Sequence, residues 1–378
     1  MEIEASAEKL SKALNNVSRI ATSKVTLPVL NNVLIKVKNK QVSLVTTNLD
    51  MAIIDFLPVS SSKDGVITVP AKLLAEFVST LPKEEKVKII SKDNKITITA
   101  DKYSSTINGS PADDFPELPE IDEKKAVVFK IGAEEFKTGI NQVLVASSND
   151  YNRPALTGVH FYTSDKALYV VATDGYRLAK KKLIKNVQSE IKVTIPSNSL
   201  QEVIRSLNDE VEEIEMSFND DLIRFRLGEL EIISKIIDAE YPNPDNLIPK
   251  KLEISVEVDR EELIRVTKLA GLFARHATND IIACEVKAPD IFSVYSIANE
   301  YGENSSSLIT ETKKEGKIFL TSRYLLDALN VFTNPKILIN FNNGSENLNI
   351  IERILVLKEP GSDDYIHTII PIPTDDIQ

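Results

Sequence analysis

The 378-residue sequence contains one cysteine, Cys284, and no tryptophan, and its aromatic residues amount to only 6%. A single cysteine excludes an intrachain disulfide, which fits the reducing cytoplasm. With so few aromatic side chains, the cores have to be built from Ile, Leu and Val. No apolar run approaches the roughly 18 residues of a membrane-spanning helix, and the first residues, MEIEA, lack the basic and apolar regions of a signal peptide. We therefore expect a cytoplasmic protein that does not enter the membrane.

Basic charge is also scarce. The sequence has 45 Lys and Arg against 56 Asp and Glu, which gives a formal net charge of −11. Taken alone, this argues against nucleic acid as a partner, because conventional DNA-binding domains are basic. Net charge does not describe how charge is distributed, however. An acidic exterior with one basic inner surface therefore stays open.

Motifs for catalysis are missing as well. The sequence has no Gly-rich phosphate loop, no His-Glu-x-x-His and no Gly-x-Ser-x-Gly elbow. The three histidines, His160, His276 and His367, are far apart and lack metal-ligand spacing. Asp50 and Asp174 recur at equivalent turns, which turn chemistry explains better than acid–base catalysis. We predict no catalytic site, no metal and no cofactor.

Repetition is the most informative feature that is present. Three segments read as a strand that runs into a short helix, and their markers Pro70, Pro196 and Thr321 are 196 − 70 = 126 and 321 − 196 = 125 residues apart. Four sets of markers in one register are not expected by chance. The other sets are the helix starts at Ser6, Gly132 and Asp259, the turns Thr47–Asp50, Thr173–Tyr176 and Asn299–Gly302, and the closing segments Phe115–Pro119 and Tyr241–Pro249.

The repeated unit has the size of a domain. Its period exceeds the roughly 20–50 residues of a solenoid unit and matches an ordinary small domain. We therefore predict three domains, at residues 1–122, 128–249 and 252–378. Within each copy, strand patterns rich in β-branched residues are interrupted by two helices. This alternation predicts an α+β fold.

The stretch Val170–Ala179 reads as two strands joined by a tight turn. Asp-Gly between two β-rich runs is a strong hairpin signal, because Gly tolerates positive φ and Asp can bond its own backbone. Alternation after the turn predicts that Tyr176 and Leu178 share one face while Arg177 points the other way. On spacing alone, the simplest interpretation is a hairpin that serves the fold.

The octapeptide Ala172–Ala179, ATDGYRLA, resembles the signature of the bacterial DNA polymerase III β subunit, the β sliding clamp. The resemblance implies a DNA clamp fold, with three repeated clamp domains that each pack two helices on antiparallel sheets and together form half of a ring. It also implies a non-catalytic processivity factor, a homodimeric ring that encircles duplex DNA and tethers the replicative polymerase. A ring holds DNA by topology, so its phosphate contacts can be weak and independent of sequence. The likeness continues through Thr26–Asn32, Asp114–Pro116, Arg153–Gly158, Tyr241–Pro249 and Ile370–Ile372.

The implied partners are double-stranded DNA of any sequence, the DNA polymerase III α subunit, the clamp loader, other repair proteins with a clamp-binding motif, and a second copy of the chain. Lys24 and Lys72 match the family's DNA-facing basic residues, and helical periodicity adds Lys12. The family often has basic residues where this sequence has Ser197 and Asn198, which weakens the case for a DNA contact in the second domain. For each lysine, the alternative is a solvated helix face.

The resemblance further implies a groove between the second and third domains that binds a short linear peptide of these partners. Apolar walls with a few polar groups suit an anchored peptide. Tyr176 departs from the family, which commonly has His there, and Pro373-Thr374 stand where the family usually ends in Arg-Leu. The positions that match the groove are Leu156, Thr173, Gly175, Tyr176, Arg177, Leu178, Pro242, Leu247, Asn347, Ile370, Pro371 and Ile372.

Other positions match the contacts through which the family's subunits pair. Ser105 replaces a usual Phe, which predicts a weaker interface. Glu300 and Glu303 are expected to face Lys102 across it. The apolar contacts match Ile107 in the first domain and Leu272 with Phe273 in the third.

The sequence disfavours two other classes of protein. A carboxylate-dependent enzyme on a repeated α+β scaffold is disfavoured, because an enzyme seldom keeps three equivalent copies while lacking every motif. A structural or adhesion repeat protein is disfavoured by the lone cysteine and the missing signal peptide.

Overall fold

The chain divides into two compact units in a computed structural model of the protein. Unit 1 comprises Met1–Glu134 and Asn198–Ile236, and unit 2 comprises Glu135–Ser197 and Ile237–Gln378. The chain therefore passes between the units within α3 (Ala133–Leu144). The structure describes residues 1–21, 27–39, 41–57, 59, 61–219, 221–277, 280–298, 302–343, 349 and 351–373.

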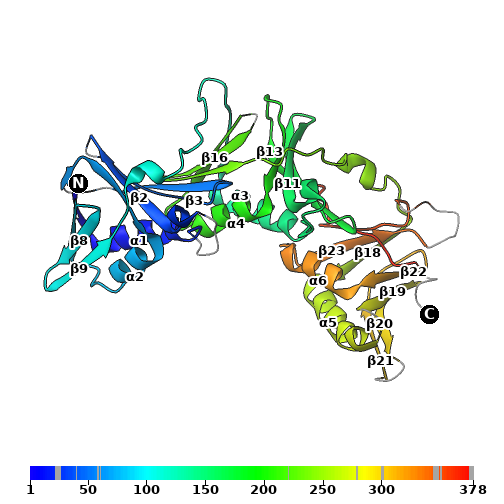
Figure 1. The fold of residues 1–378 in the computed structure, drawn as a ribbon. Helices are drawn as coiled ribbons and strands as arrows, with labels where there is room; N and C mark the ends of the chain where they lie inside the picture. The colour runs from blue at the N-terminus through cyan, green and yellow to red at the C-terminus, as the bar shows by residue number, and fades with distance from the viewer. Residues whose placement is uncertain are drawn as a thin grey trace. The chain divides into compact units, whose positions relative to one another are not determined.

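Unit 1 contains two antiparallel sheets together with helices α1 (Ala7–Ser18) and α2 (Ala71–Ser79) and most of α4 (Ser197–Ser206) (Figure 1). One sheet has the strand order β5-β1-β7-β8-β9, and the other has the order β10-β15-β16-β17-β4-β3-β2-β6. The strands are β1 (Glu2–Ser6), β2 (Asn32–Lys38), β3 (Gln41–Thr47), β4 (Met51–Leu57), β5 (Ser61–Lys63), β6 (Gly65–Pro70), β7 (Lys86–Lys92), β8 (Lys95–Ala100), β9 (Tyr103–Asn108), β10 (Val127–Gly132), β15 (Glu213–Phe218), β16 (Leu222–Leu227) and β17 (Leu230–Lys235).

Unit 2 repeats this plan with helices α5 (Arg260–Ala277) and α6 (Ser322–Val331) packed together, and with α5 lying against β20 and β21 (Figure 1). Its sheets have the orders β14-β11-β12-β13-β25-β24-β23-β18 and β21-β20-β19-β22. The strands are β11 (Gly158–Ser164), β12 (Ala167–Thr173), β13 (Arg177–Lys185), β14 (Lys192–Pro196), β18 (Ile254–Asp259), β19 (Ile281–Lys287), β20 (Ile291–Ala298), β21 (Gly302–Ile309), β22 (Gly316–Thr321), β23 (Lys336–Phe341), β24 (Leu355–Lys358) and β25 (Tyr365–Ile369). Short 3-10 helices are η1 (Pro28–Asn31), η2 (Ala112–Asp114), η3 (Pro154–Thr157) and η4 (Pro244–Leu247).

Helix α1 shows how the apolar pattern places the helices on the sheets. It contacts β3 and β4 through one apolar stripe. Ser6 Oγ caps its first turn by accepting a hydrogen bond from the Lys9 amide at 3.5 Å. Lys12 lies on the exposed side, as the periodicity predicts. The buried stripe consists of Ala7, Leu10, Ala13, Leu14 and Val17.

The repeat appears in equivalent hydrogen bonds. The Lys235 amide donates to the Asp50 carbonyl at 2.9 Å, and the Ile370 amide donates to the Tyr176 carbonyl at 2.8 Å. The two acceptors are 176 − 50 = 126 residues apart, which is the period read from the sequence. A second equivalent pair joins the Ile237 amide to the Thr194 carbonyl (2.7 Å) and the Ile372 amide to the Phe319 carbonyl (2.9 Å). These bonds confirm the repeat at the level of the backbone.

Both eight-stranded sheets continue across the boundaries between predicted copies. In unit 1, β4 of the first copy pairs with β17 of the second, and in unit 2, β13 of the second copy pairs with β25 of the third. The two compact units therefore divide the middle copy between them. The boundaries 1–122, 128–249 and 252–378 remain a prediction. All strand pairs in the described ranges are antiparallel and helices pack on them, so the α+β class is confirmed.

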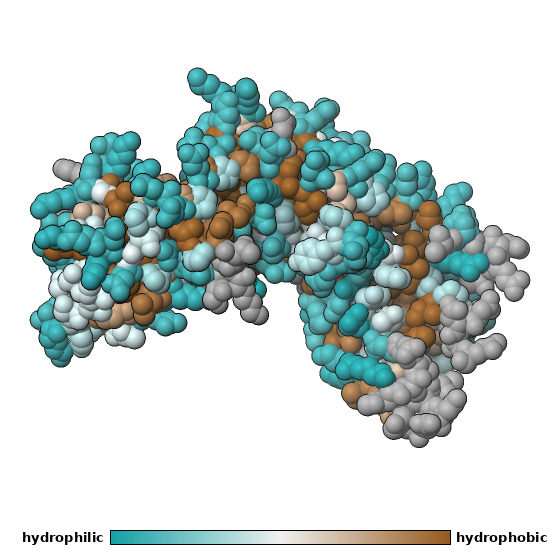
Figure 2. Space-filling model, viewed as in Figure 1, coloured by the Kyte–Doolittle hydropathy of each residue, from teal (hydrophilic) through white to brown (hydrophobic). Residues whose placement is uncertain are grey.

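Hydrophilic side chains cover most of the face shown in Figure 2, and apolar side chains gather there in separate patches. Among the described residues with large exposed apolar side chains, Ile309 is 90% exposed, Tyr176 is 58% exposed and Leu272 is 55% exposed. Tyr176 and Leu272 are predicted site residues. No helix in the described ranges is long and apolar enough to cross a membrane.

Candidate functional site

The turn between β12 and β13 has the hydrogen bonds that its sequence predicts. Thr173 Oγ1 donates to the Arg177 carbonyl at 2.6 Å and accepts from the Gly175 amide at 3.1 Å. Asp174 Oδ1 accepts from the amides of Tyr176 (2.9 Å) and Arg177 (3.0 Å). Gly175 has a φ of +93°, a region that costs a side chain strain and glycine none. The hairpin prediction is confirmed.

Arg177 ties this turn to helix α6. Its side chain is 9% exposed, with Nε 3.1 Å from Asp174 Oδ2 and Nη1 2.7 Å from Asp327 Oδ2. Its guanidinium carbon also lies 4.5 Å from the centre of the Tyr324 ring, within the range of a cation–π contact. Both carboxylates that pair with the guanidinium belong to this chain, so Arg177 links the turn to helix α6.

The predicted facing of Tyr176 and Leu178 is wrong. Leu178 is 3% exposed, whereas Tyr176 is 58% exposed and its ring centre lies 6.5 Å from that of Tyr324. Tyr176 thus shares a neighbour with Arg177. The reason is that β13 begins only at Arg177, so Tyr176 belongs to the turn and does not follow strand alternation.

The segment after β25 lies beside the same turn. Arg177 pairs with Ile369 in the sheet, and the Ile370 amide donates to the Tyr176 carbonyl. The Ile372 amide is held by the Phe319 carbonyl. Ile370, Pro371 and Ile372 are each only partly buried, so their side chains keep accessible surface next to the turn.

An apolar cluster continues the surface on the other side of β13. Its buried members are Val171, Leu178 and Tyr241, and Leu156 and Leu247 are partly buried residues packed against it. Three predicted groove residues are thus brought together from η3, β13 and η4. The predicted Pro242 follows Tyr241 and is exposed, and Asn347 lies outside the described residues. The other partly buried members are Ala155, Tyr162 and Ile248.

Sequence reasoning missed several residues of this region. Tyr324 and Asp327 were overlooked, although their i, i+3 spacing puts an aromatic ring and a carboxylate on one face of α6. Lys180 was overlooked too. Its ammonium lies 2.5 Å from Asp245 Oδ1 and 4.5 Å from the centre of the Tyr169 ring. Asp245 is 65 residues from Lys180 in the sequence, so only the fold brings this pair together.

Burial keeps two histidines in this unit uncharged, whereas Lys180 keeps its charge. Burial lowers the pKa of His367 to about 3, helped by the charge of Arg177. Burial, with the charge of Lys192, lowers the pKa of His160 to about 4. Burial would also lower the pKa of Lys180, but hydrogen bonds to Asp245 and Tyr162 outweigh it and raise that pKa. Near neutral pH both imidazoles are uncharged and Lys180 is charged.

Two of the three lysines predicted to face DNA lie in the described ranges. Lys72 is exposed near the start of α2, and Lys24 lies outside the described residues. Lys12 is exposed on α1 and its ammonium pairs with Glu210, whose pKa this hydrogen bond lowers. A phosphate that approaches Lys12 meets the negative charge of Glu210 and competes with it for the ammonium. Exposed ion pairs contribute little stability, so this exchange is easily made.

The residues predicted for subunit pairing lie on or near two sheet edges. Strand β9 is the last strand of its sheet in unit 1, and β21 is the last strand of its sheet in unit 2. Lys102 precedes β9 and is exposed, and Glu303 is exposed on β21. Ile107 is 6% exposed, so most of its side chain already belongs to the core. In α5, Leu272 is exposed and Phe273 is partly buried, while Glu300 lies outside the described residues.

The architecture defines the class of protein. Repeated copies with two helices on antiparallel sheets, joined into shared sheets, make up a DNA clamp fold. The crystal structure of the DNA polymerase sliding clamp from Bacillus subtilis matches with a TM-score of 0.92 and 26% identity over 99% of both chains. The DNA polymerase III β chain of Streptococcus pneumoniae matches with a TM-score of 0.91 and 26% identity, over 99% of this chain and 100% of that chain.

Sequence comparisons identify the family. The family profiles described as the N-terminal, central and C-terminal domains of the DNA polymerase III beta subunit match residues 1–119, 130–243 and 245–373. The "Beta sliding clamp" of Bacillus subtilis (strain 168) is 26% identical over 387 residues, which cover 99% of this chain and 100% of that protein. The chain belongs to the bacterial DNA polymerase III β subunit family. It is a sliding clamp, a processivity factor of DNA replication and not an enzyme.

Proposed function

We propose that two copies of the chain close into a ring around duplex DNA in the cytoplasm. On this proposal, each copy contributes three clamp domains, at 1–122, 128–249 and 252–378. The ring carries the DNA polymerase III α subunit, the clamp loader and other repair proteins through short peptides. The observation that carries the peptide-binding part is the bond from the Ile370 amide to the Tyr176 carbonyl, because it sets the C-terminal segment beside the Thr173–Arg177 turn.

The peptide site consists, on this proposal, of an apolar end and an aromatic end. Partly buried Leu156 and Leu247 in the cluster around Leu178 offer a surface for an apolar anchor side chain. The exposed ring of Tyr176 beside Tyr324 offers a stacking surface at the other end. The full set is Leu156, Thr173, Gly175, Tyr176, Arg177, Leu178, Pro242, Leu247, Asn347, Ile370, Pro371 and Ile372, to which the contacts of Arg177 add Tyr324.

DNA contacts are assigned to Lys24, Lys72 and Lys12. With a net charge of −11, the protein as a whole repels the phosphate backbone, so a DNA contact needs a surface on which basic side chains gather. Phosphate contacts of this kind carry no sequence information and weaken with salt. Such weak contacts suit a ring that has to slide.

The ring closes, on this proposal, between the edge strand β9 of one copy and the edge strand β21 of the other. An edge strand carries unpaired backbone groups along one side, which a second edge strand can pair. Lys102 lies at the end of one edge and Glu303 at the end of the other, where opposite charges favour one register. Glu300, which lies outside the described residues, is assigned to the same contact with Lys102. Leu272 supplies the exposed apolar surface, and Phe273, which is only partly buried, adds to it. Ile107 contributes little area, because only 6% of its surface is exposed.

Retention on DNA of different topology tests the function. The chain is loaded by a clamp loader onto nicked circular DNA and separated from free protein by gel filtration at moderate salt. We expect it to remain on the circle and to be lost once a restriction enzyme linearises the same DNA, because a ring can slide off an end. Equal retention on circular and linear DNA would show that direct contacts hold the protein, and would refute the ring.

A further inference from the structure

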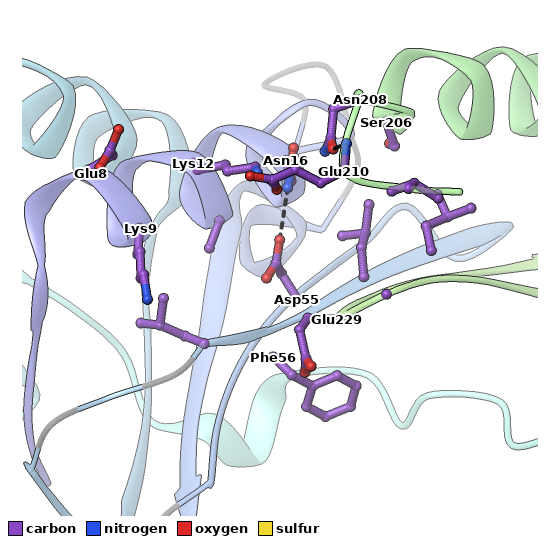
Figure 3. A pocket seen from close by; sticks show the side chains of 16 residues that line it. Glu8, Lys9, Lys12, Asn16, Asp55, Phe56, Ser206, Asn208, Glu210 and Glu229 are labelled. Carbon is purple, nitrogen blue, oxygen red and sulfur yellow. Dashed lines mark hydrogen bonds and ion pairs between the residues drawn. The ribbon is translucent and has the colours of Figure 1, made fainter. Parts of the chain in front are cut away.

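A cavity of about 460 Å³ opens in unit 1 between helix α1, strand β4, the loop after α4 and the β16–β17 turn (Figure 3). Its lining combines polar groups, among them Asn16 and Asp55, with apolar side chains that include Ala13, Leu227 and Leu230. The volume falls within the range of roughly 300–1,000 Å³ that small-ligand sites occupy. Of the residues given a role in the proposed functions, only Lys12 lines this cavity, at its rim.

The polar centre of the cavity is the Asp55 carboxylate. Asp55 is 8% exposed, and Asn16 Nδ2 donates to its Oδ2 at 2.9 Å, as the dashed line in Figure 3 marks. Within the described ranges, Asn16 is the only hydrogen-bond partner of this carboxylate. Burial raises its pKa, although the hydrogen bond from Asn16 and the charge of Lys12 oppose the rise. A buried carboxylate with unused acceptor capacity is costly, so it favours a donor that enters the cavity.

The rim does not supply that donor. The charges of Lys12 and Arg19 both act on Asp55, but the Lys12 ammonium is paired with Glu210 at the edge of the cavity, and the Arg19 guanidinium donates to Glu202, Asn16 and Ser206. Glu229, which also lines the cavity, adds negative charge near Asp55. Neither cation is hydrogen-bonded to Asp55, so the carboxylate keeps room for a charged donor from outside.

The repeat shows what the equivalent place holds in unit 2. Leu230 pairs with Asp55 in the sheet of unit 1, and Tyr365 pairs with Lys181 in the sheet of unit 2. Asp55 and Lys181 are 181 − 55 = 126 residues apart, so Leu230 and Tyr365 occupy equivalent positions. Unit 2 thus has an aromatic ring where unit 1 has a smaller aliphatic side chain next to a cavity.

That aromatic ring is buried and carries a hydrogen-bond donor. The Tyr365 ring packs 4.7 Å from Phe332, centre to centre, and its hydroxyl donates to the Gln142 carbonyl at 2.8 Å. Gln142 is equivalent to Asn16, because 142 − 16 = 126. This position of the repeat therefore accepts, in unit 2, a flat aromatic ring that carries a hydrogen-bond donor.

We propose that the cavity binds a compact aromatic cation, whose ring lies against Leu227 and Leu230 and whose charged group pairs with the Asp55 carboxylate. An amidinium or guanidinium group suits the carboxylate best, since it offers two parallel N–H donors. The apolar wall provides the area that a single ring buries. The site is independent of the peptide site and of ring closure.

Isothermal titration calorimetry of the full chain with benzamidine tests the proposal. We expect one saturable site, at least tenfold weaker binding of neutral benzamide, and no binding of benzoate. Asp55→Asn keeps the shape of the side chain but removes its charge, and should weaken benzamidine binding at least tenfold. Leu230→Tyr places in unit 1 the ring that unit 2 already has and should abolish binding. Asp64→Asn changes an exposed carboxylate that does not line the cavity and should leave binding unchanged.

The outcomes separate cleanly. Equal affinity for benzamidine and benzamide, unchanged affinity in the Asp55→Asn and Leu230→Tyr variants, or no saturable heat would each overturn the proposal. If one variant fails to fold by circular dichroism, the other variant and the comparison of ligands still decide. Benzamidine stays charged in acid, so its binding should also weaken as Asp55 takes up a proton. This loss should begin at a higher pH than the pKa of an ordinary aspartate would give, because the pKa of Asp55 is raised.

Discussion

Replacing Arg177 with alanine removes the side chain that joins the β12–β13 turn to helix α6. Its guanidinium is shared by Asp174 and Asp327, at 3.1 Å and 2.7 Å, and also lies over the Tyr324 ring. In the variant, two carboxylates that share one cation are left without it, and Tyr324 loses its cation–π partner. The turn that carries Tyr176 then has no side-chain link to α6 through position 177.

The magnitude follows from burial. Removing one partner of a fully buried ion pair costs about 3–5 kcal/mol. The side chains of Asp174 and Asp327 are 15% and 37% exposed, so water recovers part of this. We therefore expect the ordered conformation of the turn to be destabilised by about 2 kcal/mol relative to disordered conformations. A peptide that has to restore this order on binding loses the same amount, which is roughly 30-fold in Kd.

Fluorescence anisotropy with a labelled clamp-binding peptide of the polymerase α subunit measures the loss. Arg177→Lys keeps the charge but not the planar fork, and should give an intermediate loss. Arg265→Ala is the matched control, because Arg265 is an exposed arginine on α5 that pairs with Glu262 three residues earlier. A folded Arg177→Ala variant that binds within twofold of the wild type would refute this account of the site, as would an Arg265→Ala variant that loses as much.

Three further predictions concern the turn, the buried histidine and the ring. Gly175→Ala should lower the free energy of unfolding by about 1–2 kcal/mol in urea titrations, because position 175 has a φ of +93°; no change would contradict the assigned turn. Burial holds the pKa of His367 at about 3, below the ordinary 6.5. Between these two values the unfolded chain carries a proton on His367 that the folded chain does not, so the free energy of unfolding decreases as the pH falls through this range. His367→Gln should reduce this slope by about 1.4 kcal/mol per pH unit, and an unaltered slope would mean that His367 does not carry it. Leu272→Asp should convert particles of twice the 42.0 kDa chain mass into single chains in light scattering; an unaffected dimer would place the interface elsewhere.

The sequence predicts the repeat and the turn well because both are local or periodic. The 126-residue period places Asp50 and Tyr176 at equivalent positions, and the carbonyl of each accepts an equivalent hydrogen bond. The turn follows from Asp-Gly chemistry within a few residues. Even here the face of Tyr176 was predicted wrongly, because alternation was counted from one residue before the strand begins.

Contacts between distant residues are what the sequence could not provide. Arg177 meets Asp327 across 150 residues, and Lys12 meets Glu210 across 198. No pattern within either segment reports such a partner. The resemblance suggests that Ile107 contacts the second subunit. The structure shows that Ile107 packs into the core of its own unit and is only 6% exposed, which no sequence pattern reveals. Pairings of this kind depend on how the sheets assemble.

The sharing of sheets between successive copies limits how this protein can be taken apart. Strand β17 lies between β16 and β4, so severing the chain near residue 122 or 250 separates strands that are hydrogen-bonded partners. An excised copy would expose a strand whose backbone groups have lost their partners. Such an edge can pair with other molecules and favours aggregation. Fragments for crystallisation or display should therefore keep β4 together with β17, and β13 together with β25.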